Sequence, residues 1–395
     1  MADTSSITIH QAFQTPFVQG VISQFPTPDY ALQRSYGAMT NRTFTPTRQF
    51  GWDQFNKTRT VATIKAPMTD ASVIHRQKIG TAYGALLRVA EKLHIYDEEI
   101  MNLRPPGAPI GTLDSRGEQW VVRQVDFMTR RHSNLMEYLL AKTLQGGFGL
   151  ARSGEMYYVT ALSASGNEYD IDMNIPASHK SQLAVGTGGA NVISQSWADA
   201  SADIVTQMLQ LRQAAIRETG YDQTEVWCSS TTIGNLMNNV SLQSIAGSAN
   251  RTWNTFTKAP AVGVDPANRT LGGMTVSFNA IPWLTFNVND VVMSVGSSTD
   301  PQGSDGTTTT LAPRIIPENT VIFTPKPDND WLTIYEGQEP IQEQVGGQST
   351  VVKGFHTWSR RLPVAAPPSR EAYMIDNFLP AIRVPNAVYV ATVVF

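Results

Sequence analysis

The chain has 395 residues, 41% of them hydrophobic and 16% charged, so it is long enough for roughly two or three domains with a sizeable core. Its formal net charge of −3 argues against a dedicated nucleic-acid-binding protein with a strongly basic face. The single cysteine, Cys228, excludes an intramolecular disulfide framework, and the lack of a secretion signal or an apolar run of about eighteen residues predicts no contact with a membrane.

The first part of the chain predicts an extended arm and then a long loop. Residues 1–54 are polar and aromatic with scattered Pro and Gly, which is typical of an arm rather than of a packed unit. Residues 59–67 alternate as a strand does. Residues 81–93 carry apolar residues on one helical face, whereas the adjoining residues 92–96 alternate like a strand, so both structures remain open here. A Pro/Gly cluster at 104–111 ends the segment.

One uninterrupted helix is predicted over residues 115–146. Ser115 and Glu118 have the spacing of a capping box, and Gly146 with Gly147 supplies a stop. Apolar positions predict one buried stripe: Val121, Val125, Met128, His132, Leu135 and Leu139. Polar positions predict an exposed face: Arg123, Asp126, Arg130, Asn134 and Glu137. At roughly 45 Å the helix is longer than a compact domain needs, so it can brace an elongated molecule; a long core helix of an ordinary enzyme is the alternative.

A hairpin and a second helix are predicted next. Residues 156–162 and 168–175 read as two strands of the hairpin, since the second run alternates apolar and polar residues. The second helix is expected over 199–220, with Gly220 as its stop. Its buried face is expected to hold Ile204, Met208, Leu211 and Ala215.

The rest of the chain predicts a mixed unit. A strand at 225–228 leads into a short helix whose cap lies within the Ser/Thr run 229–232. From 241 to 354 strands alternate with loops such as 298–310. The chain ends in a strand-like run at 388–395.

Side chains that could perform chemistry do not form a convincing site. The histidines have no metal-binding spacing: His10, His75, His94, His132, His179 and His356. His132 lies on the apolar helix face and is interpreted as a core histidine, and Cys228 at a strand end is interpreted as structural. The glycine-rich loop 185–191 lacks both phosphate-loop patterns. We read the acidic run 97–99 and the Arg130–Arg131 pair as solvated surface, and we predict a protein that is not an enzyme, with no catalytic, cofactor-binding or metal-binding residues and no cofactor.

Three segments carry a resemblance to a known family. They are 194–239, a helix followed by a strand and a short helix; 316–325, a Pro-Glu-Asn strand; and 369–395, a C-terminal return. These segments, in this order after an arm, a loop and a long helix, resemble the major capsid proteins of tailed bacteriophages with the HK97-type fold. Within them they resemble the lambda-like family, major capsid protein E.

The resemblance implies an α+β subunit of known organisation. Its expected parts are an N-terminal arm (1–54), an extended loop (55–113), a peripheral domain (114–198 and 355–395, with the spine helix at 115–146) and an axial domain (199–354). The charge is divided along the chain, with 17 Lys+Arg against 12 Asp+Glu in residues 1–152 and 13 against 21 in residues 153–395. A positively charged N-terminal part and a negatively charged C-terminal part can attract copies of one chain to each other.

The resemblance also implies a function and partners. Copies would assemble as hexamers and pentamers into an icosahedral shell that encloses the double-stranded DNA of a phage, in the virion, after assembly in the bacterial cytoplasm. Met1 is present and no acidic helical segment follows it, which implies a separate scaffolding protein and no removal of a propeptide. A portal, a decoration protein and non-specific contact with the packaged DNA are further expected partners. The alternatives are an encapsulin-like nanocompartment shell and a cytoplasmic α+β enzyme.

Overall fold

The computed structural model describes these residues: 30–37, 42–55, 79–96, 115–183, 191–242, 255–258, 274–278, 281–291, 293, 314–327, 330–342, 349–353, 356–361 and 369–395. Within them helices and sheets are mixed, which confirms the α+β class. Several predicted features lie outside the described residues: the arm at 1–29, His10, the strand at 59–67, His75, the acidic run 97–99, most of the loop 185–191 and the loop 298–310.

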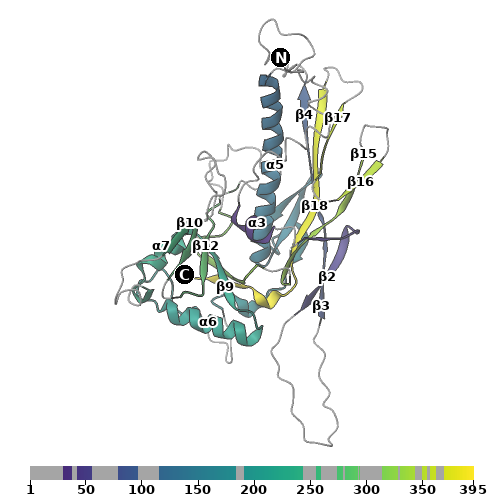
Figure 1. Cartoon of the computed structure of the whole chain (residues 1–395). Coiled ribbons are helices and arrows are strands. Elements are labelled where there is room, and N and C mark those ends of the chain that lie inside the picture. The colour runs from purple at the N-terminus through teal and green to yellow at the C-terminus, as the bar shows by residue number, and fades with distance from the viewer. Residues whose placement is uncertain are drawn as a thin grey trace, which may run out of the picture.

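An elongated unit is built on one helix and one long strand that run side by side (Figure 1). Helix α5 (Ser115–Leu144) lies along strand β18 (Ser369–Ile382). Strand β18 belongs to a five-stranded sheet in which it pairs with three others: β14 (Leu332–Glu336), β17 (His356–Arg361) and β4 (Leu87–Tyr96). The fifth strand, β1 (Arg42–Phe44), pairs in parallel with β14. Strand β18 has 14 residues and helix α5 has 30, and at about 3.3 and 1.5 Å per residue the two elements have similar lengths.

The ambiguous residues 81–93 are strands. They lie in β3 (Ile79–Ala85) and β4, and β4 pairs antiparallel with β18 along its whole length, from Leu87 opposite Phe378 to Tyr96 opposite Ser369. This pairing satisfies the backbone of β4 along that edge and also covers the edge of β18, which a helix with its internally bonded backbone would leave unpaired. Strand β3 forms a hairpin with β2 (Gln49–Phe55), and a second hairpin joins β15 (Gln338–Gln342) to β16 (Ser349–Lys353).

The predicted hairpin between 156–162 and 168–175 is wrong in its pairing. Strand β5 (Gly147–Ser153) lies between β6 (Met156–Thr160) and β7 (Asn167–Asp172) and pairs antiparallel with both. Gly147 has a φ of 126°, and a Cβ at this position would lie 2.2 Å from the carbonyl oxygen of Ile171. Gly147 thus follows the end of the helix, as predicted, and also lets β5 approach β7 closely.

A second unit contains a seven-stranded sheet, and helices α6 and α7 lie beside it (Figure 1). Its strand order is β10 (Thr255–Lys258), β11 (Met274–Ser277), β12 (Thr285–Val288), β9 (Gln223–Cys228), β13 (Thr320–Pro325), β19 (Tyr389–Thr392) and β8 (Lys180–Ser181). The helices are α6 (Ile204–Glu218) and α7 (Ser230–Asn238). The remaining short helices are α3 (Ala31–Tyr36), η2 (Ala177–His179) and η3 (Pro385–Ala387).

Local signals place both helices of this unit. The predicted buried face of α6 is confirmed, since Ile204, Met208, Leu211 and Ala215 are all buried. The helix begins five residues later than predicted because Asp203 caps it, accepting a hydrogen bond from the Thr206 N–H at 3.2 Å. Ser229 caps α7 in the same way through the Thr232 N–H, which confirms the predicted Ser/Thr cap.

The long helix is confirmed, and its faces only in part. Val125, Met128 and Leu139 of the predicted stripe are buried, and Leu135 is half-buried against the core. The prediction that Glu137 is exposed is wrong, because its side chain has no exposed surface. Other elements surround the last two turns of α5, since Leu139, Leu140, Ala141 and Leu144 are all fully buried, and Glu137 directly before them is buried as well.

The buried face of α5 gives a direct test. Leu139→Asp should unfold the chain, because it places a charge in a fully buried position at a cost of several kcal/mol. The matched variant Phe127→Asp changes an apolar residue of the same helix that is 55% exposed, and it should melt close to the parent. If both variants had the same melting temperature in a thermal melt, the assignment of Leu139 to the buried face would be wrong.

Candidate assembly surfaces

His132, Cys228 and His179 lie in structural contacts. His132 contacts Asp376 of β18, with Nε2 2.9 Å from Oδ2, which confirms its interpretation as a core histidine. Cys228 is buried, and burial raises the pKa of its thiol far above the usual range, which agrees with its interpretation as structural. His179 is buried and stacked on Tyr389, with its Nε2 3.3 Å from Glu218. The described part of the chain holds no cluster of three metal-ligating side chains and no helix able to span a membrane.

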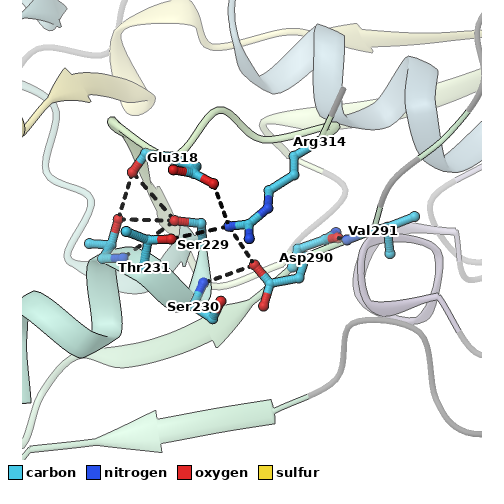
Figure 2. A network of polar contacts seen from close by, with 9 residues as sticks. Ser229, Ser230, Thr231, Asp290, Val291, Arg314 and Glu318 are labelled. Atoms are coloured by element: carbon cyan, nitrogen blue, oxygen red, sulfur yellow. Dashed lines mark hydrogen bonds and ion pairs between the residues drawn. The ribbon is translucent and has the colours of Figure 1, made fainter. Parts of the chain in front are cut away.

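A polar network surrounds the start of α7 (Figure 2). The Arg314 guanidinium lies 3.2 Å from the Asp290 carboxylate and 3.3 Å from that of Glu318. Asp290 accepts a hydrogen bond from the Ser230 N–H at 2.9 Å, and the Glu318 carbonyl accepts one from Thr232 Oγ1 at 3.0 Å. The helix end and the arginine are thus satisfied by groups of the same chain, so the network fastens the segment before β13 to α7 rather than forming an anion site.

A second polar centre joins the two units around Glu137. Its Oε1 accepts hydrogen bonds from the Leu32 N–H at 3.1 Å and from Asn289 Nδ2 at 3.1 Å. Its Oε2 accepts one from the Gln33 N–H at 2.9 Å. Leu32 and Gln33 lie in α3, and Asn289 directly follows β12, so one carboxylate of the long helix holds both the arm and the seven-stranded sheet.

An exposed aromatic pair stands on the three-stranded sheet. Tyr157 of β6 and Tyr169 of β7 are 44% and 55% exposed, and their ring centroids are 6.1 Å apart. Met156 beside them is 43% exposed. Exposed acidic residues, Glu155 and Glu168, lie next to the pair in the sequence. Aromatic residues on an exposed sheet are typical of protein interfaces, and this one suits a partner that carries positive charge.

The β2–β3 hairpin offers a second exposed surface. Ile79 and Tyr83 of β3 are 59% and 78% exposed, whereas Trp52 of β2 is buried and donates a hydrogen bond from Nε1 to the Ile382 carbonyl at 3.1 Å. The hairpin is therefore anchored on its inner face, and its outer face exposes Ile79 and Tyr83 beside the polar Asp53 and Thr81. Between its strands the sequence of residues 56–78 has five basic side chains and one acidic one.

Local sequence patterns do not indicate most of the residues that fasten the elements together. Asp376 is paired with His132 at a separation of 244 positions, and neither local pattern indicates the other. For Glu137 one signal was present: it is followed by Leu139, Leu140, Ala141 and Leu144, all fully buried. A charged residue at the edge of such an apolar run is a candidate for burial with hydrogen-bond partners.

Comparisons with known proteins agree with this architecture. The family model described as phage major capsid protein E matches residues 18–393. No curated protein matches the chain. A solved structure described as a capsid protein of a prophage (E. coli CFT073) is similar with a TM-score of 0.54 at 10% identity, covering 96% of this chain and 99% of that chain. This likeness confirms the HK97-like fold.

Two further structures are similar over most of their length. A phage-related protein from Bordetella bronchiseptica RB50 has a TM-score of 0.46 at 13% identity and covers 96% of each chain. The mature capsid of bacteriophage PhiM1 has a TM-score of 0.42 at 12% identity, covering 90% of this chain and 86% of that chain.

Proposed function

Because the chain belongs to the phage major capsid protein E family, we propose that its two units and its hairpins are the contact surfaces of a shell subunit. The chain is a major capsid protein, which assembles with copies of itself into the icosahedral shell that encloses phage DNA. The observation that carries this conclusion is the family match over residues 18–393. It favours the capsid over the alternatives of an encapsulin-like compartment and a cytoplasmic enzyme.

We further propose the oligomers and the partners of assembly. Copies form hexamers and pentamers, with a separate scaffolding protein and a portal during assembly in the bacterial cytoplasm, and a decoration protein is a further candidate partner. The exposed tyrosine pair with its acidic neighbours and the basic residues 56–78 are complementary in charge. This complementarity supports contacts between copies of the chain.

We retain the division into four parts as a proposal: arm 1–54, extended loop 55–113, peripheral domain 114–198 with 355–395, and axial domain 199–354. The packing of β18 along α5 supports joining the end of the chain to the helix unit. Strand β19 instead pairs with β13 in the seven-stranded sheet, so the last residues also contact the axial part.

Electron microscopy tests the function directly. The full-length chain, produced with its scaffolding protein, should form closed shells. We propose that it has no catalytic turnover, which is supported by its family and by the structural use of His132 and Cys228. Small globules in the micrographs, together with a saturable activity that one point substitution removes, would contradict the proposal.

Contact with DNA should be weak and independent of sequence. The net charge of −3 cannot support the many phosphate contacts that tight binding to duplex DNA requires. In a filter-binding or anisotropy experiment at physiological salt, unassembled subunits should bind a duplex no more tightly than about micromolar, with equal affinity for different sequences. Nanomolar affinity would show that the proposal is wrong.

A further inference from the structure

Helix α3 has no cap of its own and is capped by the long helix. Its N-cap residue, Tyr30, makes no side-chain capping bond. The N–H groups of Leu32 and Gln33 in its first turn instead donate to the two carboxylate oxygens of Glu137, 105 and 104 positions away. The third donor, Asn289 Nδ2, comes from the seven-stranded sheet unit. All three donors are neutral, and the carboxylate has no exposed surface.

The other end of α3 is fixed to the second unit. The Tyr36 hydroxyl accepts a hydrogen bond from Trp227 Nε1 of β9 at 3.0 Å and lies 3.0 Å from Thr324 Oγ1 of β13. Its ring also meets Trp331 edge-on at 5.6 Å. The six-residue helix therefore bridges α5 and the seven-stranded sheet, with Glu137 at one end and Tyr36 at the other.

We propose that Glu137 is a proton-controlled latch that holds α3 across the junction of the two units. When α3 is docked, the carboxylate is enclosed; when α3 leaves, the same group gains water. A charged carboxylate is disfavoured in the enclosed state unless its donors fully replace the water that it loses. Burial therefore favours the protonated form of Glu137 in the docked state, and the three hydrogen bonds to its oxygens oppose this effect.

The electrostatic surroundings agree with this direction. Burial raises the pKa of Glu137 from 4.5 to about 7, against the lowering effect of the hydrogen bonds from Leu32, Gln33 and Asn289. The charged side chain that acts on it is Arg34 of α3, whose lowering effect is smaller than that of the hydrogen bonds. Tyr30, the N-cap residue of α3, is a titratable neighbour of Glu137, and its own pKa is raised, chiefly by burial and then by Glu137.

The direction of the pH dependence of docking follows from the pKa of Glu137, which is 4.5 in the released state and about 7 in the docked state. Between pH 4.5 and about pH 7 the docked state binds more protons than the released state. Docking is therefore strongest in acid and weakens as the pH rises through this window. Above about pH 7 the proton on Glu137 no longer stabilises the docked state. Between about pH 5 and about pH 8.5 the docking equilibrium should weaken on the order of 100-fold.

Hydrogen–deuterium exchange of the purified full-length chain measures this directly. The amides of residues 31–37, corrected for the intrinsic pH dependence of exchange, should lose protection on the order of 100-fold between about pH 5 and about pH 8.5. The amides of α6, which is remote from Glu137, should keep theirs. Equal protection of residues 31–37 at both pH values would overturn the latch, with no variant needed.

Two variants identify the group responsible. Glu137→Gln removes the titration, so the protection of residues 31–37 should no longer depend on pH. Glu168→Gln makes the same change at an exposed side chain and should behave as the parent does. If Glu137→Gln retained the pH dependence of the parent, another group would carry it and the latch would be refuted. The readout is intramolecular, so it is independent of shell formation.

Discussion

A chain in which residues 56–78 are replaced by a short Asn-Gly turn should fold but form no shells. The ends of the hairpin permit this change, because Phe55 of β2 and Ile79 of β3 are directly paired and a two-residue turn can connect paired strands. Gln54 keeps the base of the hairpin in place through hydrogen bonds from its Nε2 to the carbonyls of Met173 and Ile382, at 3.2 and 3.3 Å. The melting temperature should therefore change little.

The loss of assembly follows from charge and repetition. Residues 56–78 have five basic side chains against one acidic one, and residues 153–395 are acidic in balance. One exposed ion pair contributes less than about 1 kcal/mol, but every contact around a closed shell repeats it. Electron microscopy and sedimentation should show free subunits for the variant, and high salt should slow early assembly of the parent.

A charge-reversed variant separates charge from length. Lys57→Glu, Arg59→Glu and Lys65→Glu together keep every residue of the segment, and this triple variant should also fail to assemble. The observation against the prediction would be normal-sized shells from the turn-replaced chain. The removable segment is limited to 56–78, because a longer deletion would remove β3 and the part of β4 that pairs with β18.

Removing the imidazole of His132 should strongly destabilise the elongated unit. Asp376 is 1% exposed, and its carboxylate has no hydrogen bond from any other described group. His132→Ala would leave this charge buried without a partner, which typically costs about 3–5 kcal/mol. It would also remove the edge-on contact of the ring with Phe378 at 5.6 Å. A thermal or urea melt should show a large loss of stability.

A double-mutant comparison separates the charge from the lost packing. Asp376→Asn removes the carboxylate charge at nearly the same volume, so it should partly restore the stability of His132→Ala. A substitution at the exposed ion pair between Asp126 and Arg130 on the same helix, such as Asp126→Asn, should cost less than about 1 kcal/mol. Our account of the pair would fail if Asp376→Asn made the His132→Ala chain no more stable.

The candidate site could be predicted only in part. The sequence indicates that residues 56–78 are basic and that His132 is a core histidine, since composition and helical spacing suffice for both. The role of Glu137 could not be read in the same way. Its spacing places it opposite the apolar stripe, and only the arrival of α3 and Asn289 from other parts of the chain encloses it.

The sequence by itself determined helices α5, α6 and α7. The length of α5, the buried face of α6 and the cap of α7 follow from residues within one or two turns, because helical hydrogen bonds and caps join groups close in the chain. The tertiary structure decided which strands pair and which charges are buried. Strand β5 between β6 and β7, β4 against β18, and the partners of Glu137 and Asp376 all depend on segments distant in sequence. A local pattern can describe the apolar and polar faces of an element, but not the element that packs against each face.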